Sequence, residues 1–464
     1  MMKLVCTALI ALTISLPAHP QLVPQSKTLA IANVTIIDAT GAAAKPGMTV
    51  VIAGDRITEI GRSGKVKLPK DAQVVEGRGK FLIPGLWDMH VHAFAANLFF
   101  PLFIANGITG VRDMFGSIAT IKNWRQQMAE GKLTGPRLYA AGPIVDGPKP
   151  IWPGSIAVKD EAEGRQAVAK VKADGSDFVK VYSLLPREAY FAIADEAKKL
   201  GISFAGHVPA TVTAAEASDA GQKSIEHLDR VLLGCSTSEA EFVSQGARIT
   251  SEQRKKMLET YSEEKARALF ARFAKNGTWH SPTLVVLRAI SHLDDPKITN
   301  DPRLKYLSPF VTAQWDPTKD FRFRNYTPAT YESMRANYRK NLELVGKMRR
   351  AGVEFLAGTD TPNPYCFPGF SLHDELQLLV QAGLTPMEAL QAATRNPAKF
   401  TGQLDRLGTV EKGKLADFVL LDANPLADIA NTKKIRAVVS NGKLFDSDAL
   451  QQMLADVEKT AGRK

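Results

Sequence analysis

The middle of this chain alternates short apolar segments with longer stretches of helical character, and this alternation limits the possible folds more than any other feature. Short apolar segments of this kind are typical of buried β-strands. Eight are present: Leu86–His92, Thr109–Met114, Arg137–Gly142, Phe178–Ser183, Ser203–Val208, Ser224–Asp229, Thr278–Leu284 and Glu354–Asp360. Helices are expected between most of them, for example over Glu161–Ala173 and Arg187–Leu200, and Gly201 and Gly352 mark helix ends.

Eight apolar strands that alternate with helices predict an α/β fold, namely a closed parallel (β/α)8 barrel of the TIM type over residues 84–400. The structural alternative is an open doubly wound sheet, which normally has fewer strands. That alternative is disfavoured because the sequence lacks a glycine-rich phosphate loop. Two long connections, 230–277 and 285–345, are expected at the active-site end of the barrel as a lid or substrate pocket.

Both ends of the chain show short β-strands and no helical period. The expected strands are Leu29–Ile37, Met48–Ile52 and Arg56–Ile60 near one end, and Asp417–Leu421 and Ile435–Ser440 near the other. Asn441-Gly442 is a strong turn signal after the last of these. We therefore predict one small β-sandwich built from residues 27–83 and 401–447, with a C-terminal helix or tail over 448–464.

Residues 1–20 have the pattern of a secretory signal peptide. Lys3 supplies the positive start, and the apolar run Leu4–Leu16 is too short to span a bilayer but suits a signal core. Because Leu16-Pro17-Ala18 and Ala18-His19-Pro20 are both imperfect cleavage sites, the sequence does not fix where cleavage occurs. An exported protein, periplasmic or secreted, is predicted, with an uncleaved N-terminal anchor as the alternative. No other segment is apolar for long enough to cross a membrane.

Composition narrows the class of protein further. Hydrophobic residues at 45% and charged residues at 23% are ordinary for a globular enzyme and exclude a disordered chain. The net charge is +11, but lysine and arginine are scattered, so a solvated basic surface is favoured over a nucleic-acid partner. Cys235 and Cys366 follow the signal segment and allow one disulfide at most. Neither lies in a CxxC pair, which argues against a thiolate zinc site.

Histidines gather at the predicted strand ends. His90 and His92 alternate on one strand, so both side chains face the same way and can reach one metal ion. His207 and His227 end two later strands, and Asp360 ends the last. Active-site groups of barrels collect at the C-terminal ends of the strands. The chain has only 8 histidines, so four in this arrangement predict a metal site rather than unrelated buried imidazoles.

Lys180 lies at the centre of the apolar strand Phe178–Ser183. A buried lysine needs either a salt-bridge partner or a lowered pKa, because desolvation of its charge is costly. A neutral amine can take up carbon dioxide and become a carbamate. The resulting carboxylate-like group would suit a position between two metal ions.

These motifs together resemble the binuclear members of the amidohydrolase superfamily, above all the imidazolonepropionase-like proteins and the Xaa-Pro (prolidase-like) dipeptidases. The resemblance covers nearly the whole chain after the signal segment. Besides the order His-x-His, lysine, His, His, Asp, it is carried by Leu82–His92, by Asn396-Pro397-Ala398-Lys399 and by Gly408–Val419. These motifs are specific for the superfamily and much less specific for a substrate.

The resemblance implies a role for each metal ligand. His90 and His92 would bind the more buried ion with Asp360, carboxylated Lys180 would bridge two ions, and the second ion would be bound by His207 and His227. Zn²⁺ is the default ion, with Mn²⁺, Co²⁺ or Fe²⁺ as alternatives. Asp360 would be the general acid/base that moves a proton from the attacking water to the leaving amine.

Four further side chains are candidates for the site. Tyr182 faces inward and could donate to a carbonyl oxygen or a substrate carboxylate, with core packing as the alternative. His280 could contact substrate. Arg112 is expected to pair with Asp113 or to line the pocket, and the structural role is favoured. His373, at the start of the last barrel helix, is expected to be a helix-start or supporting group.

The sequence therefore predicts a metal-dependent hydrolase of a small molecule, cleaving a C–N amide bond in dipeptides or N-acyl amino acids. Opening of a cyclic amide or imidazolone is the nearest alternative. Hydrolysis of an ester, lactone or phosphotriester is a third, because the same metal centre serves those reactions. A silent ligand-binding barrel is disfavoured because every predicted metal ligand is present. Assembly into a homo-oligomer is left open.

Overall fold

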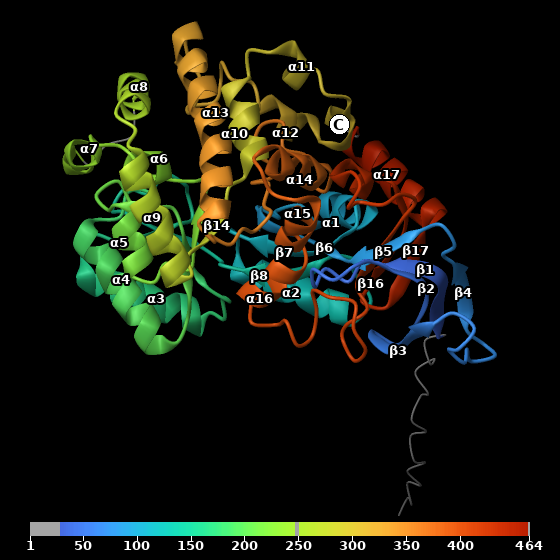
Figure 1. The fold of residues 1–464 in the computed structure, drawn as a ribbon. Helices are drawn as coiled ribbons and strands as arrows, with labels where there is room; N and C mark the ends of the chain where they lie inside the picture. The colour runs from blue at the N-terminus through green and yellow to red at the C-terminus, as the bar shows by residue number, and fades with distance from the viewer. Residues whose placement is uncertain (1–27, 246–249, 463–464) are drawn as a thin grey trace, which may run out of the picture.

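The computed structural model describes residues 28–245 and 250–462. Strands from both ends of this range join in one sheet, in the order β17-β16-β15-β5-β1-β2-β3, with β4 paired to β1. Figure 1 shows the N-terminal strands, drawn in blue, beside the C-terminal β16 and β17. The bounds are β1 Leu29–Ile36, β2 Lys45–Ala53, β3 Arg56–Arg62, β4 Gln73–Glu76, β5 Phe81–Pro84, β15 Phe418–Leu421, β16 Ile435–Ser440 and β17 Lys443–Asp446.

The two ends of the chain meet through β5 and β15, which pair antiparallel from Phe418 opposite Pro84 to Leu421 opposite Phe81. Side chains from both ends then share one apolar cluster that includes Ile31, Val50, Phe418 and Val439. Hydrogen bonding therefore joins the strands of both ends into one continuous sheet, while the division of the chain into a barrel and a small sandwich domain stays a prediction.

The middle of the chain forms the predicted parallel barrel. Two groups of strands are hydrogen-bonded within themselves, β6-β7-β8 and β10-β9-β11-β12-β13-β14. Their bounds are β6 Leu86–Val91, β7 Ile108–Asp113, β8 Arg137–Ala140, β9 Ile144–Asp146, β10 Ile156–Ala157, β11 Val179–Val181, β12 Phe204–Gly206, β13 Ser224–Glu226 and β14 Trp279–Ser281. The third expected strand, Arg137–Gly142, corresponds to β8, which ends at Ala140; Gly142, at a positive φ of 73°, separates β8 from β9, which was not predicted.

Backbone hydrogen bonds join the two groups into a ring. On one side, Asp177 donates its N–H to the carbonyl of Ala140 at 2.9 Å. On the other side, the expected eighth strand lies between β14 and β6: Leu356 donates to His280 at 2.9 Å, and Asp360 donates to His90 at 2.7 Å. This segment is not a regular strand, since Asp360 has a positive φ of 61°. It nevertheless occupies the eighth position of the barrel.

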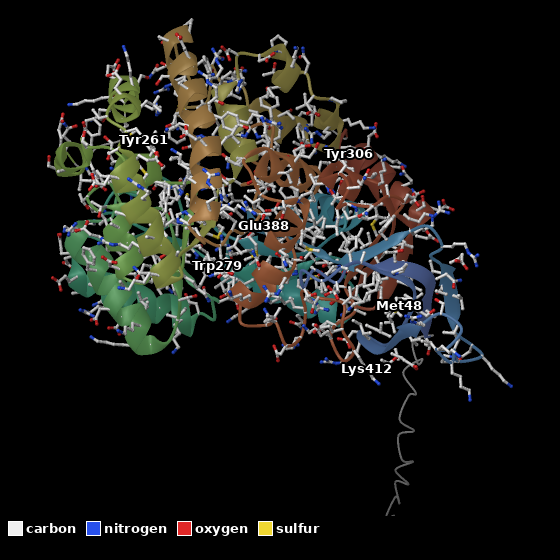
Figure 2. All side chains as sticks on the ribbon, viewed as in Figure 1. Met48, Tyr261, Trp279, Tyr306, Glu388 and Lys412 are labelled. Carbon is white, nitrogen blue, oxygen red and sulfur yellow. The ribbon has the colours of Figure 1, made fainter. Side chains whose placement is uncertain are left out.

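Helices surround the barrel, and both helices predicted in detail have the expected bounds, α3 at Glu161–Ala173 and α4 at Arg187–Leu200. Asp160 begins α3 by accepting a hydrogen bond from Glu163 N–H at 2.9 Å, and Gly201 ends α4 in the left-handed region. The other barrel helices are α1 Ala96–Ala105, α2 Ile118–Ala129, α5 Ala214–Asp219, α14 Phe370–Gln381, α15 Pro386–Ala392 and α16 Arg395–Phe400. Trp279 of β14, labelled in Figure 2, belongs to an apolar cluster that also contains Phe400 of α16. The centroids of these two rings lie 5.9 Å apart.

The two long connections are mostly helical and rise together on one side of the barrel (Figure 1). They contain α6 Val231–Gly234, α7 Glu239–Gln245, α8 Ser251–Glu259, α9 Glu263–Asn276, α10 Leu284–Ser291, α11 Pro296–Thr299, η1 Pro302–Tyr306, α12 Pro309–Ala313 and α13 Pro328–Arg350. Four prolines of the second connection stand at the first position of a helix, where a missing N–H costs nothing. The proline-rich composition therefore reflects helix starts rather than irregular loop.

Two helical elements follow the barrel, η2 Ile429–Lys433 and α17 Ser447–Ala461. The helix alternative for the C-terminal segment is the one observed, because α17 packs Leu450 against Ile104 and Phe445. Cys235 and Cys366 are both free and buried, so the disulfide that the sequence allowed is not formed. The predicted signal segment over 1–20 lies outside the described residues. Within the described ranges, none of the helices combines the length and the apolar character that a membrane span requires.

Candidate active site

All six side chains predicted to bind metal line a single cavity of about 720 Å³ at one end of the barrel. They come from five strands: His90 lies on β6 and His92 follows it, Lys180 lies on β11, His207 follows β12, His227 follows β13, and Asp360 ends the eighth segment. The cavity walls are completed by residues of the second long connection, including Leu287, Trp315 and Phe321. The six side chains thus lie around one cavity, while their role as metal ligands stays a prediction.

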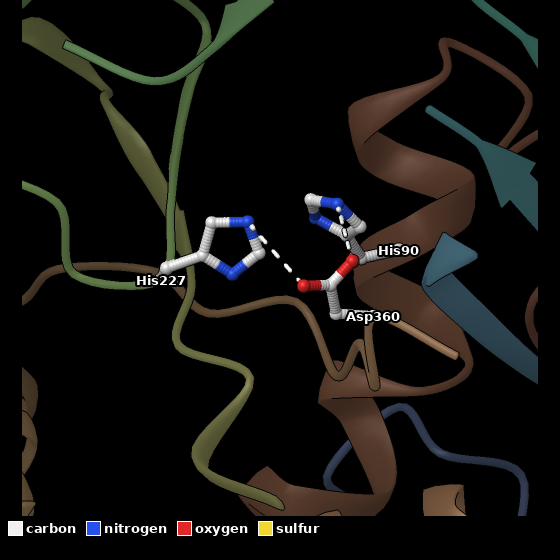
Figure 3. Close-up of side chains that lie close together, drawn as sticks. All are labelled: His90, His227 and Asp360. Carbon is white, nitrogen blue, oxygen red and sulfur yellow. Dashed lines mark ion pairs between the residues drawn. The ribbon is translucent and has the colours of Figure 1, made fainter. Parts of the chain in front are cut away.

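Asp360 occupies the centre of the cluster. Its Oδ1 lies 2.9 Å from His92 Nε2 and 3.4 Å from His90 Nε2, and its Oδ2 lies 3.9 Å from His227 Nε2. Figure 3 shows His90 and His227 on either side of this carboxylate. One donor atom each from His90, His227 and Asp360 lies within 4.8 Å of the others, which is the spacing of ligands around one ion.

In three of the imidazoles, Nδ1 lies within hydrogen-bond distance of an oxygen atom. His90 Nδ1 donates to Glu226 Oε2 at 2.9 Å, since a carboxylate can only accept. His227 Nδ1 lies 2.7 Å from Thr283 Oγ1, and His207 Nδ1 lies 2.9 Å from Ser183 Oγ. A proton on Nδ1 leaves the lone pair on Nε2, which is the arrangement typical of metal-binding histidines. The residues present therefore fit a divalent ion of the kind that imidazole and carboxylate ligands bind.

Electrostatics favour the protonation states that metal binding requires. Burial, followed by the charge of Lys180, lowers the pKa of His90 well below its usual value, and burial also lowers the pKa of His227. Both imidazoles are thus neutral at pH 7. Burial alone would raise the pKa of Asp360, but His227 and His92 together hold that pKa below its ordinary value. The site therefore combines neutral nitrogen ligands with an ionised carboxylate.

Lys180 is only 1% exposed and, within the described ranges, forms no ion pair closer than 4 Å. Burial lowers its pKa to about 8, although Glu226 and Asp360 act in the opposite direction. A substantial fraction of the side chain is then an uncharged amine in mildly alkaline solution. Such an amine can react with carbon dioxide, as the sequence analysis expected of this position.

Comparison with known proteins identifies the family. A model described as "Amidohydrolase family" matches residues 81–445, which is more than three quarters of the chain. This protein belongs to the amidohydrolase family. The resemblance inferred from the sequence is therefore confirmed.

The curated relatives that this amidohydrolase matches carry different names. Ochratoxinase of Aspergillus niger is 40% identical over 101 residues, which is 21% of this chain and 20% of the relative. Imidazolonepropionase of Agrobacterium fabrum is 39% identical over 95 residues, 19% of this chain and 22% of the relative. The sequence matches thus span only about a fifth of these curated relatives.

The solved structures match over more of the chain. A bottromycin amidohydrolase superposes with a TM-score of 0.76 and 22% identity, covering 94% of this chain and 91% of that one. A Xaa-Pro dipeptidase superposes with a TM-score of 0.65 and 21% identity, covering 91% and 100%. These likenesses establish the shared fold.

A buried ion pair that was not predicted from the sequence supports the candidate metal site of this amidohydrolase. Arg112 Nη2 donates to Glu226 Oε2 at 2.7 Å, and both side chains are fully buried. The same Glu226 oxygen accepts from His90, so Arg112 fixes His90 through Glu226. Arg112 does not pair with Asp113, whose carboxylate instead accepts the N–H groups of Ala93 and Phe115. Glu226, an acidic residue in an apolar strand directly before His227, was the signal in the sequence from which a buried ion pair could have been predicted.

Tyr182 lies in the cavity, as expected for a substrate-contacting residue. Its ring centroid is 4.1 Å from that of His207, and its hydroxyl accepts a hydrogen bond from Trp152 Nε1 at 2.9 Å. Burial raises the pKa of Tyr182 to about 12, so the hydroxyl stays protonated and can donate.

His280 lies outside the cavity, contrary to the expectation that it contacts substrate. Its ring packs 4.6 Å from the ring of Phe273 on α9, and both ring nitrogens are buried without a hydrogen-bond partner in the described structure. The reason is the alternation along β14: Ser281 faces His90, so its neighbour His280 faces the helix layer. His373 is also remote, on α14, where it bonds Thr432 and the carbonyl of Asn106. Its structural role matches the favoured expectation.

Proposed function

We propose that this amidohydrolase is a metal-dependent hydrolase of C–N amide bonds in dipeptides or N-acyl amino acids. The observation that carries the proposal is the convergence of His90, His227 and Asp360 on one point, with the outer imidazole nitrogens already held by Glu226 and Thr283. We further propose Zn²⁺ as the default ion, two ions per chain, and a carboxylated Lys180 between them.

The residues of the site divide the chemistry between them. A divalent ion held by these ligands would polarise the substrate carbonyl and lower the pKa of a water molecule. Asp360 is ionised at neutral pH, so its carboxylate can accept a proton from the attacking water and deliver it to the leaving amine. The protonated hydroxyl of Tyr182 can donate to the carbonyl oxygen or to a substrate carboxylate.

The size of the cavity and the relatives support a small amide substrate. A volume of about 720 Å³ is within the range of small-molecule sites, about 300–1,000 Å³, and leaves no room for a folded protein. The solved structures of similar fold include a bottromycin amidohydrolase and a Xaa-Pro dipeptidase, whose names refer to amide or peptide bonds.

A substrate panel tests the proposal. Dipeptides and N-acyl amino acids are compared with cyclic amides, esters, lactones and phosphotriesters, before and after chelator treatment and again after Zn²⁺ or Co²⁺ is restored. We expect cleavage of linear amides that is lost with chelator, regained with metal, and absent from Asp360→Asn. His280→Leu is the matched control, since His280 lies outside the cavity. Cleavage that survives complete metal removal would refute the proposal.

We also propose export, on the pattern of residues 1–20 alone. The test is the N-terminal sequence of the protein recovered from the cell envelope or the medium. A chain that starts between about residue 17 and residue 24 supports export with cleavage. A chain that keeps Met1 and stays with the cytoplasmic fraction contradicts it.

A further inference from the structure

A second cavity, of about 660 Å³, adjoins the metal-site cavity. The two cavities share wall residues that include Tyr182, His207 and His227. A ligand whose reacting bond lies at the metal cluster can therefore extend into both cavities. We refer to the first as the metal chamber and to the second as the polar chamber.

The two chambers differ in chemistry. The walls of the metal chamber include four aromatic side chains that do not line the polar chamber, Phe94, Phe115, Trp315 and Phe321. Phe94 and Phe321 are 59% and 51% exposed, although large apolar side chains are usually covered. The polar chamber has aromatic residues as well, Phe323 and Tyr326, but it adds arginine and amide side chains that do not line the metal chamber: Arg230, Arg254, Asn325, Asn337 and Asn341. A substrate with one apolar end and one anionic end matches this division.

Arg230 carries the argument for the anionic end. Its Nη1 is buried and has no hydrogen-bond partner among the described residues. A buried donor on a charged group that lacks a partner is rare in proteins and calls for an explanation. Arg230 also lies three positions after His227, in a turn where both residues have a positive φ, 60° and 59°. The turn that carries a metal ligand thus also brings this guanidinium to the polar chamber.

The other charged groups of the polar chamber, Arg254, Arg322 and Asp229, all have interactions within the protein. Arg322 donates to both carboxylate oxygens of Asp320 and to Asn363 Oδ1 at 2.7 Å. Asp229, the acidic residue of the chamber, accepts the N–H of Val208 at 3.0 Å and lies 3.9 Å from His207 Nδ1. None of these groups forms a hydrogen bond with Nη1 of Arg230. A planar guanidinium matches a carboxylate in two parallel hydrogen bonds, which makes a carboxylate the best-fitting ligand.

We propose that Arg230 binds the carboxylate of the amino acid that leaves the substrate, while the acyl group occupies the aromatic part of the metal chamber. The substrate class is then an N-acyl amino acid or dipeptide with an aromatic or bulky apolar acyl side and a free carboxylate. This proposal rests on the proposed function, because it assumes that an amide bond is placed at the metal cluster.

A pair of matched substrates tests the assignment. One is an N-aroyl amino acid, and the other is the N-aroyl alkylamine of the same length without the carboxylate. We expect Arg230→Gln to lower kcat/KM for the first by about 10- to 100-fold, as for loss of a charge-assisted pair, and to leave the second within about twofold. Arg230→Lys should lower kcat/KM less than Arg230→Gln does, because lysine keeps the positive charge but lacks the planar guanidinium. Arg324→Gln, an exposed arginine outside both chambers, is the control.

Equal losses for both substrates, or no loss for either, would overturn the assignment. Calorimetric binding of the product amino acid, with and without its carboxylate, separates this result from the proposed function. If wild type cleaves no linear amide but binds the free carboxylate through Arg230, the proposed function fails and the carboxylate site stands. If linear amides are cleaved and carboxylate binding is unchanged in Arg230→Gln, the proposed function stands and the assignment of Arg230 fails.

Discussion

Replacing Arg112 by methionine should destabilise the barrel far more than the same replacement at a half-buried arginine. The Arg112 guanidinium donates to Met89 O at 2.5 Å, to Ser224 Oγ at 2.9 Å and to Glu226 Oε2 at 2.7 Å, and the residue is 0% exposed. Methionine replaces the aliphatic stem of arginine with an apolar chain of similar shape, so the packing of the stem is largely kept. The main effect is that Glu226 becomes a buried carboxylate without its cation.

The expected cost follows from that geometry. Removal of one partner from a buried ion pair destabilises a protein by about 3–5 kcal/mol, because the remaining charge is left uncompensated. Arg125→Met is the control. Arg125 also pairs with a carboxylate, Asp177 at 2.5 Å, but these two side chains are 32% and 28% exposed. Solvent screens such a pair, so its loss should cost about 1 kcal/mol or less.

The assay is urea unfolding followed by tryptophan fluorescence. A third variant, Arg112→Met with Glu226→Leu, removes both charges and should be less destabilised than Arg112→Met alone. Equal free energies of unfolding for Arg112→Met and Arg125→Met would refute the reasoning, as would a double variant that is less stable than Arg112→Met. Metal affinity should fall about 10- to 100-fold in Glu226→Gln, because this variant loosens the group that orients His90.

Three further predictions concern Lys180, His280 and Glu375. Lys180→Ala should lose bound metal, with partial return on addition of a short carboxylic acid, and full metal content in that variant would exclude a carbamate. His280→Leu should keep kcat/KM within about twofold and unfold at the same free energy or a higher one, because it removes two buried nitrogens that lack partners; a tenfold loss of kcat/KM would place His280 back in the mechanism. Glu375 is buried on α14, outside the cavity, and accepts a hydrogen bond from the N–H of Val285 at 2.8 Å. Burial raises the pKa of Glu375 from 4.5 to about 8, so between these pH values the folded state holds a proton that the unfolded state has released. The stability that this group contributes therefore falls as pH rises from 4.5 to about 8. The melting temperature of the wild type should therefore fall, relative to that of Glu375→Gln, as pH rises from 4.5 to about 8. Melting temperatures of the two proteins that change in parallel with pH would contradict this.

The sequence alone predicted the structure correctly where the signal depends only on neighbouring residues in the chain. Helices α3 and α4 were predicted to the residue, because Asp160 and Gly201 mark ends that short-range chemistry determines. The six side chains that line the cavity could also be predicted to lie close together. Each lies on or directly after an apolar strand, and the C-terminal ends of such strands meet at one end of a barrel.

Side-chain direction and long-range pairing were harder to predict. His280 was misplaced because β14 comprises only three residues, which is too few for the alternation to show which neighbour faces inward. Arg112 and Glu226 are 114 positions apart, so nothing in either local segment identifies the other as its partner. The irregular eighth segment was predicted as a strand because its apolar pattern does not reveal the positive φ of Asp360.

The transition-metal content of the chain, purified without chelators, tests the central claim most directly. We predict at least one tightly bound equivalent in wild type, and less than about one tenth of that in the variant His227→Ala with Asp360→Ala, which removes two of the three closest ligands. The control variant His280→Leu should retain the wild-type content. Metal well under one equivalent in wild type, or the same content in all three proteins, would contradict the account.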